Sequence, residues 1–282
     1  MCRWMAYSGD PAPAEALLFR PAHSLINQSL HARLGVETTN GDGFGLGWFG
    51  ERRVPGVYKS VLPAWNDPNL REISREIRSR LLFAHVRAST GAAVQRSNCH
   101  PFRHGRWLWM HNGAIADFPR LKRDVMLAVD PSLYPEIEGT TDSEALFYLA
   151  LTFGLMDDPP GAVARTVGLV EDLGRRRGVP DPLQMTVATS AGESIWVFRY
   201  SSLGRTRSLF YSTDIAQLRR LYPGMDVLQR LGTDARFVVS EPIQHLEGAW
   251  TEVPESSYAI VRPGTHELHP LVPVRPRQET TA

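Results

Sequence analysis

Cys2 is the residue with the clearest chemical capability in this sequence, because it directly follows the initiating Met1. If Met1 is removed, Cys2 carries both a thiol and a free α-amino group. The thiol is nucleophilic as the thiolate, and an α-amino group with a pKa of about 7.7 to 8.0 can accept a proton near neutral pH. A cysteine here can equally be a small buried hydrophobic residue, so the rest of the sequence must separate the two interpretations.

Two further groups of polar residues follow predicted strands. Arg87 comes directly after the apolar run 81–86, which has the composition of a strand buried on both faces. A charged residue there can meet a ligand at the edge of a sheet, although an ordinary arginine at the rim is the simpler interpretation. Asn112 and Gly113 follow the strand-like segment 106–110. An Asn-Gly pair is commonly a tight turn, but it also offers a side-chain amide donor and an unobstructed N–H.

Asp142 lies at the predicted start of a helix. Thr141 is followed three residues later by Glu144, which is the pattern of a capping box, so a helix is expected over 141–153. A carboxylate in the first turn of a helix is favoured by the helix dipole. This placement explains Asp142 without a role in binding, and the helix pattern alone does not decide between the two.

The glycine-rich segment 40–50, NGDGFGLGWFG, does not have the spacing of a phosphate-binding loop. Phe44, Leu46 and Trp48 instead alternate with glycines, which is the period of a strand with one face bare of side chains. Such a face allows another backbone or a ligand to approach closely.

Cys99 and His100 lie together in the segment 98–102, NCHPF. Four metal ligands cannot be assembled around them at any standard zinc spacing, so no metal site is predicted. Cys99 is expected to be a small core residue, and His100 a hydrogen-bonded structural histidine.

The composition restricts the partners and the compartment. Thirty-one basic and thirty acidic residues give a net charge of +1, so no overall field favours nucleic acid or an anionic membrane. Two cysteines exclude a disulfide framework. The N-terminal sequence lacks the pattern of a signal peptide, and no apolar run is long enough to span a bilayer. A cytoplasmic location is therefore expected.

Strands, then helices, then strands again indicate an α+β fold with antiparallel sheets packed between helices. Helices are expected at 14–20, 69–80, 119–129, 141–153, 160–176 and 214–222. Strands are expected at 2–8, 81–86, 106–110, 184–190, 194–200, 208–212, 236–240, 250–253 and 258–261. We expect residues 2–265 to form one domain and the proline-rich residues 266–282 to form a loose tail.

Six short segments occur in one characteristic order: Cys2, 41–48 (GDGFGLGW), 85–90 (HVRAST), 98–102 (NCHPF), 111–113 (HNG) and 140–144 (TTDSE). In this order they resemble the class II glutamine amidotransferases, which are N-terminal nucleophile hydrolases. The resemblance covers the first half of the chain, and the later strands at 240–262 are similar to the end of stand-alone members. It implies a four-layer αββα sandwich of two mostly antiparallel sheets between helices, in a single class II amidotransferase domain.

The resemblance assigns the chemical steps to three residues. Cys2 supplies the thiolate, and its α-amino group carries the proton. The side chain of Asn112 and the N–H of Gly113 stabilise the tetrahedral oxyanion, where loss of one donor typically costs about a hundredfold to a thousandfold in rate. No cofactor and no metal are implied.

The resemblance also assigns the recognition of substrate. Arg87 pairs with the α-carboxylate of a γ-glutamyl group, since its planar guanidinium matches a carboxylate. Asp142 accepts from the α-ammonium. His100 and Thr90 are expected just behind the residues that contact substrate. Neither His85 nor His100 is required as an acid or base in this class.

Within the class, the segment 20–29 with the glycine-rich strand is most similar to fungal glutathione-degrading amidotransferase subunits, and the stand-alone group also includes ergothioneine-pathway γ-glutamyl hydrolases. No synthase domain is recognisable after residue 150. The expected function is hydrolysis of a γ-glutamyl amide, a small-molecule substrate. One alternative is a glutaminase subunit that delivers ammonia to a separate synthetase. Another is an inactive glutamine-binding module.

Two features leave the specificity and the assembly open. Ala88 stands where ammonia-transferring members often carry Trp, so the preference for glutamine is in doubt. A homo-oligomer, or a complex with a synthetase or peptidase, is compatible with the sequence.

Overall fold

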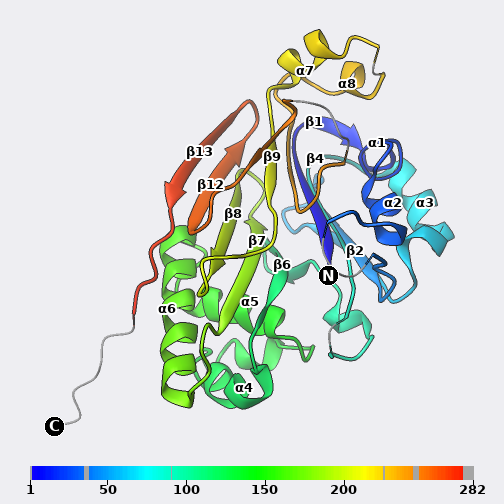
Figure 1. Ribbon diagram of the computed structural model, residues 1–282. Coiled ribbons are helices and arrows are strands. Elements are labelled where there is room, and N and C mark those ends of the chain that lie inside the picture. Colours follow the sequence, from blue (N-terminus) through cyan, green and yellow to red (C-terminus); the bar gives the residue numbers. More distant parts are fainter. Residues whose placement is uncertain (1, 35–37, 90, 225, 244–247, 276–282) are drawn as a thin grey trace.

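The computed structural model describes residues 2–34, 38–89, 91–224, 226–243 and 248–275 (Figure 1). Within these residues, strands form a seven-stranded and a six-stranded sheet, in which all neighbouring strands are antiparallel. The seven-stranded sheet has the order β11 (Trp250–Glu252), β9 (Phe210–Ser212), β10 (Arg236–Val239), β1 (Arg3–Pro13), β4 (Arg78–Val86), β2 (Phe44–Trp48) and β3 (Gly56–Ser60). The six-stranded sheet has the order β13 (Thr265–Pro270), β12 (Ser257–Arg262), β8 (Ile195–Ser201), β7 (Leu183–Ser190), β6 (Trp107–Ile115) and β5 (Phe102–His104).

Helices cover the outer faces of both sheets (Figure 1). The seven-stranded sheet packs against α1 (Ala14–Leu18), α2 (Leu25–Leu30), α3 (Pro68–Glu76), α7 (Ile215–Leu221) and α8 (Asp226–Arg230). The six-stranded sheet packs against α4 (Phe118–Leu127), α5 (Asp142–Thr152) and α6 (Pro159–Arg177). Short 3₁₀ turns occur at Ala64–Asn66, Arg96–Asn98 and Tyr134–Glu136.

The period-two pattern of the strands explains the layers. In β1, Trp4 and Ala6 belong to the apolar cluster between the sheets, whereas Met5 and Tyr7 belong to the cluster under the helices. The strands of the other sheet divide their side chains in the same way, because successive residues of a strand point to opposite faces. The predicted αββα sandwich is therefore confirmed.

The start of α5 and both ends of α6 follow the capping signals in the sequence. Thr141 Oγ1 accepts from the Glu144 N–H at 3.2 Å, which confirms the predicted helix start. Asp158 caps α6, and Gly178 ends it with φ of 65°, a left-handed conformation that glycine adopts without strain.

The glycine-rich strand β2 confirms the prediction of a bare face. A Cβ atom on Gly45 would collide with the carbonyl oxygen of His100, and one on Gly47 would press against Pro101 and Leu108. The neighbour that uses the bare face is thus the backbone of the 98–102 segment.

Several predicted boundaries are wrong; the strand expected over 2–8, for example, continues to Pro13 as β1. The helix expected over 69–80 ends at Glu76, and residues 78–80 already belong to β4, because Ile77 fits the apolar pattern of either element. The tail expected from residue 266 begins with a paired strand, since β13 forms a ladder with β12. The paired segment continues to the buried Leu271 and to Val274, whose N–H donates to the carbonyl of Ala164 at 2.9 Å. The single-domain assignment of 2–265 stays a prediction, and residues 276–282 lie outside the described residues.

Candidate active site

Cys2 lies at the start of β1, at one end of the space between the sheets. Because side chains alternate along a strand, Cys2 points to the same side as Trp4 and Ala6, which pack between the sheets. The residue is partly exposed, and its Sγ donates to the carbonyl of Ala88 at 3.5 Å. The thiol is therefore held by the segment that follows β4 while part of the residue stays accessible.

Asn112 reaches Cys2 from the opposite sheet. It lies in β6, on the same face as Leu108 and Met110 of the cluster between the sheets. Its Nδ2 donates to the carbonyl oxygen of Cys2 at 2.9 Å. A primary amide carries two N–H donors, so one can hold Cys2 while the other serves a ligand.

Gly113 presents its N–H away from the neighbouring strand β7. The N–H of Ala116 donates to the carbonyl of Pro182 at 2.7 Å, and hydrogen-bonded pairs alternate along an antiparallel ladder. Gly113 therefore falls in a non-hydrogen-bonded pair. The N–H of Ile115, two residues further on, follows the same rule and donates to Asp142 Oδ2 at 2.8 Å. The N–H of Gly113 thus points to the edge of β6 on which Asp142 lies.

Glycine is required at position 113, because a Cβ there would collide with the carbonyl oxygen of Gln184. The Asn-Gly pair lies inside β6, so the interpretation as a tight turn after residue 110 is wrong. Asp142 begins α5, and its second oxygen, Oδ1, accepts from the Ser143 N–H at 2.7 Å.

Arg87 is buried, with 4% of its surface exposed, so the interpretation as an ordinary rim arginine is wrong. Its guanidinium donates to the carbonyls of Ala92 at 3.3 Å and Ala93 at 3.2 Å, and to Ser89 Oγ at 3.1 Å. These bonds fold the segment after β4 around a positive charge, one residue before the carbonyl that accepts from Cys2. Thr90, which was expected near the site, lies outside the described residues.

Residues 20–269 match the family of class II glutamine amidotransferases. The chain belongs to this family. It is 33% identical to the probable glutamine amidotransferase DUG3 of Saccharomyces cerevisiae, in an alignment that covers 96% of this chain and 85% of that protein. It is 30% identical to the gamma-glutamyl-hercynylcysteine sulfoxide hydrolase of Mycolicibacterium smegmatis over 199 residues, which cover 70% of this chain and 82% of that protein. These relatives indicate that the chain is an enzyme.

Solved structures support the same assignment. A class II glutamine aminotransferase domain protein of Silicibacter pomeroyi superposes with a TM-score of 0.73 at 31% identity, covering 97% of this chain and 100% of that one. The glutamine phosphoribosylpyrophosphate amidotransferase of Bacillus subtilis has a TM-score of 0.58 at 15% identity over 96% of this chain and 49% of its own. The second likeness concerns the fold alone, which is that of N-terminal nucleophile amidotransferases.

Three buried histidines adjoin the site of this amidotransferase. The rings of His85 and His100 stack with centroids 4.2 Å apart, and His111 Nδ1 lies 2.7 Å from Ser143 Oγ. Burial lowers the pKa of His85 to about 3 and that of His111 to about 4, and burial beside His85 lowers the pKa of His100 well below its usual range. All three are therefore neutral at pH 7. Such rings are poor general acids.

Cys99 has the surroundings of a core residue. It is fully buried, and its Sγ lies 3.5 Å from the carbonyl oxygen of Ser60 and 3.6 Å from that of Gln95. Burial raises the pKa of its thiol, which disfavours the reactive thiolate. Within the described residues, no group of three or more His, Cys, Asp or Glu side chains is arranged to hold a metal ion.

Sequence reasoning missed a buried ion pair next to Cys2. Arg3 Nε donates to Glu241 Oε2 at 2.7 Å, and both side chains are almost completely buried. The sequence contained a signal for each partner. Arg3 is a charge within the apolar segment CRWMAY, and Glu241 is a charge directly after the apolar segment RFVVS. Charges that interrupt buried strands usually have a partner.

No helix in the described part of the chain has the length and apolar composition to cross a bilayer.

Proposed function

We propose that this amidotransferase hydrolyses a γ-glutamyl amide through a γ-glutamyl thioester on Cys2. The observation that carries the proposal is the arrangement of residues around Cys2, at the start of β1. The amide of Asn112 contacts the backbone of Cys2, and the N–H of Gly113 lies on the same edge of β6 as the carboxylate of Asp142. The proposal takes Cys2 as the nucleophile, Asn112 and Gly113 as the two oxyanion donors, and Asp142 as the carboxylate that binds the substrate.

The chemistry begins once Met1 has been removed. The α-amino group of Cys2 takes the proton of its thiol, and Sγ forms a bond to the γ-carbonyl carbon of the substrate. The oxyanion receives hydrogen bonds from Asn112 Nδ2 and the Gly113 N–H. When the C–N bond breaks, the proton returns from the α-ammonium to the leaving amine. Water then attacks the thioester, regenerates the thiol and releases glutamate.

Arg87 and Asp142 recognise the two charges of a free glutamyl group in this proposal. The guanidinium of Arg87 now donates to neutral acceptors, namely backbone carbonyls and a serine hydroxyl. A carboxylate is a stronger acceptor for guanidinium and can replace some of them. Asp142 accepts from two backbone N–H groups and from the Ser143 hydroxyl, and keeps a lone pair for an ammonium. An internal peptide glutamine lacks both charges and is rejected.

The named relatives support a γ-glutamyl substrate. The Mycolicibacterium protein is a hydrolase of a γ-glutamyl compound, and the yeast protein is described as a probable glutamine amidotransferase. Both descriptions name a γ-glutamyl amide, glutamine in one case and a γ-glutamyl conjugate in the other. We therefore favour a γ-glutamyl amide, either glutamine or a γ-glutamyl peptide or conjugate.

The yeast description also supports a second candidate. In this alternative the site is the same, but the ammonia released from glutamine passes to a separate synthetase. Turnover of glutamine that rises several-fold with a co-purifying partner would favour it. Strong activity of the isolated chain on a γ-glutamyl compound other than glutamine would argue against it.

The nucleophile is tested with a glutamine-mimicking electrophile and peptide mass spectrometry. We expect a single adduct on Cys2, which is lost in Cys2→Ala and retained in Cys99→Ala. An adduct on Cys99 in the wild type would refute the assignment. A screen of γ-glutamyl amides, with glutamate release as the measurement, then identifies the leaving group.

A further inference from the structure

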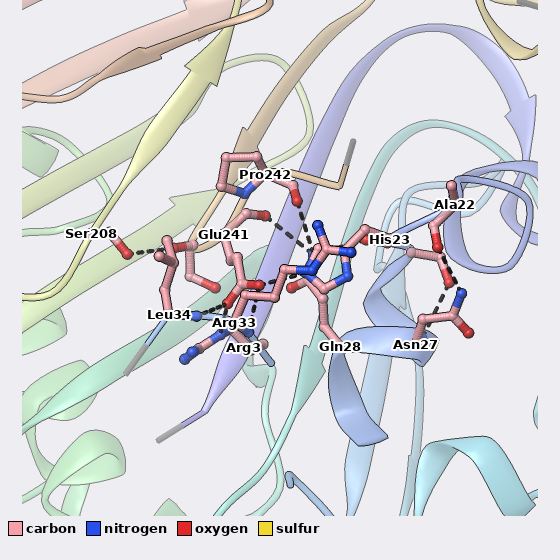
Figure 2. A network of polar contacts seen from close by, with 12 residues as sticks. Arg3, Ala22, His23, Asn27, Gln28, Arg33, Leu34, Ser208, Glu241 and Pro242 are labelled. Atoms are coloured by element: carbon pink, nitrogen blue, oxygen red, sulfur yellow. Dashed lines mark hydrogen bonds and ion pairs between the residues drawn. The ribbon is translucent and has the colours of Figure 1, made fainter. Parts of the chain in front are cut away.

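A buried carboxylate stands directly behind the nucleophile. Figure 2 shows Arg3, His23, Arg33 and Leu34 gathered around Glu241, which has 1% of its surface exposed. One carboxylate oxygen accepts from Arg3 Nε at 2.7 Å and from the Leu34 N–H at 3.0 Å. The other accepts from the Arg33 N–H at 2.9 Å and contacts His23 Nε2. Four contacts from three separate parts of the chain therefore fix the position of this carboxylate.

The charge of Glu241 persists in spite of its burial. Burial alone would raise its pKa, but the hydrogen bonds from His23, Arg33, Leu34 and Arg3 outweigh burial and lower the pKa. The carboxylate is thus ionised at neutral pH and forms an ion pair with the permanently charged guanidinium of Arg3.

Arg3 transmits this fixed position to Cys2. Its Nη1 donates to the carbonyl oxygen of Cys2 at 3.0 Å, while Nε holds Glu241. The same carbonyl oxygen accepts from Asn112 Nδ2 at 2.9 Å. The Cys2 carbonyl is consequently held by one donor from its own sheet and one from the opposite sheet. Since the peptide group is planar, this fixes the position of the Cys2 Cα, which carries both the α-amino nitrogen and the side chain. The contact of Sγ with the Ala88 carbonyl then orients the thiol.

The residue before Glu241 strengthens the same connection. The Trp4 N–H donates to Ser240 Oγ at 2.9 Å, and the Ser240 N–H donates to the Trp4 carbonyl at 3.0 Å. Residues 3 and 4 are therefore tied to residues 240 and 241 through backbone and side chain together. The first residues of β1 cannot shift relative to the last residues of β10 without breaking several of these bonds.

A contribution to stability does not by itself explain a buried pair at this point. Removing two charges from water costs several kcal/mol, and well-packed apolar side chains often stabilise a core equally well. What an apolar pair cannot supply is a directed donor to the Cys2 carbonyl, and the fork of a guanidinium can serve two acceptors at once.

We propose that Arg3 and Glu241 are positioning residues, which hold the backbone of Cys2 so that its thiol and α-amino group face the substrate. The proposal rests on the proposed function, because it requires Cys2 to be the nucleophile. Neither residue contacts substrate. Their loss should slow the reaction of Cys2 while leaving the binding of substrate by Arg87 and Asp142 almost unchanged.

The test compares the variants Arg3→Met, Arg3→Lys and Glu241→Gln with the wild type. A displaced reacting group can cost up to about a hundredfold, so we expect kcat and the rate of Cys2 labelling to fall about tenfold to a hundredfold in Arg3→Met and Glu241→Gln. The KM should change by less than about threefold, because a loss confined to kcat marks an effect on the reacting groups. Arg3→Lys keeps the charge but not the fork, so we expect partial rescue relative to Arg3→Met.

Arg236 offers a matched control. It is a buried arginine of the same sheet, donates to the carbonyls of Ala235 and Gly264, and lies 3.6 Å from Asp214. Its register partner on β1 is Ser8, six residues from Cys2, or roughly 20 Å along the strand. Arg236→Met should lower the melting temperature without changing kcat or the labelling rate.

The outcomes separate the two proposals. If the wild type is labelled on Cys2 and the folded variants Arg3→Lys, Arg3→Met and Glu241→Gln are labelled at the same rate, the positioning role is overturned. The proposed function is not affected by this result. Equal losses of kcat in Arg236→Met and Glu241→Gln also overturn the positioning role, because a general loss of stability would then explain both. If Glu241→Gln does not fold, the two Arg3 variants decide. A wild type with neither Cys2 label nor turnover refutes the proposed function itself.

Discussion

The two cysteines of this chain differ in almost every property that controls the reactivity of a thiol. Cys2 is partly exposed and lies where two sheets end, with its thiol on the Ala88 carbonyl and its backbone held by Asn112 and Arg3. Cys99 is fully buried, and its thiol faces the carbonyl oxygens of Ser60 and Gln95.

Under the proposed function, the difference teaches that the fold, and not the residue type, determines which cysteine is the nucleophile. Burial disfavours a thiolate at Cys99 and raises the pKa of its thiol. Cys2 combines access for substrate with donors that can stabilise a negative charge nearby. It also has, after removal of Met1, a base within its own residue. The following predictions test this contrast, beginning with the largest effect.

Replacing each cysteine in turn gives the largest contrast. Cys2→Ala removes the nucleophile, so kcat should fall by at least about a thousandfold. Cys99→Ala removes a small buried side chain, so we expect a loss of about 1 to 2 kcal/mol in the free energy of unfolding and a kcat near the wild-type value. Glutamate release and urea unfolding measure the two quantities. Comparable losses of kcat in both variants would show that the contrast is false.

Asn112→Ala should have the next largest effect. The variant loses an oxyanion donor and the contact with the Cys2 carbonyl, so we expect kcat to fall about a hundredfold to a thousandfold. Asn112→Asp, which has the same shape, provides the matched control because it replaces the amide donor by a repelling negative charge. Steady-state kinetics should place both variants far below the wild type. A folded Asn112→Ala enzyme with wild-type kcat would contradict the oxyanion role.

Arg87→Lys should affect substrate binding more than chemistry. A lysine keeps the positive charge but loses the planar pair of donors, and a charged hydrogen bond contributes about 1.5 to 3 kcal/mol. We therefore expect KM to rise roughly tenfold or more, with a smaller change in kcat. Titration of a glutamate-like inhibitor checks the binding directly. An unchanged affinity would mean that Arg87 only organises the segment after β4.

The buried histidines His85 and His111 provide the smallest effect, which is seen in stability. His85 and His111 are neutral in the folded chain down to about pH 3 and pH 4, whereas an unfolded histidine takes up a proton below about pH 6.5. The unfolded state then binds more protons, so the free energy of unfolding should fall as the pH drops from 6.5 to 5. The slope approaches about 1.4 kcal/mol per pH unit for each histidine.

Urea unfolding between pH 7 and pH 5 measures this slope, above the range in which most carboxylates titrate. His85→Gln, where it folds, should show a shallower slope than the wild type. A constant free energy of unfolding over this range would mean that water reaches these histidines and that burial does not lower their pKa values.

The sequence predicted those features that depend on neighbours along the chain. The period of β1, the Thr141 cap of α5, the end of α6 at Gly178 and the bare face of β2 all follow from local patterns. The order of the six motifs was sufficient to recognise the family and hence the αββα layers.

Features that depend on long-range register escaped prediction. Arg3 and Glu241 are 238 positions apart, and no local pattern pairs them. The strand β13, THELHP, has too little apolar alternation to be recognised as a strand and is defined by its ladder with β12. The end of α3 was misplaced because Ile77 satisfies both a helical and a strand period.

The most direct test of the central claim is the mass of the working enzyme. The enzyme is mixed with a γ-glutamyl amide, quenched in acid during turnover and analysed by intact and peptide mass spectrometry. We expect a chain that begins at Cys2 and carries one γ-glutamyl group on that residue, absent in Cys2→Ala. Turnover by a chain that retains Met1, or an acyl group on any other residue, would contradict the account.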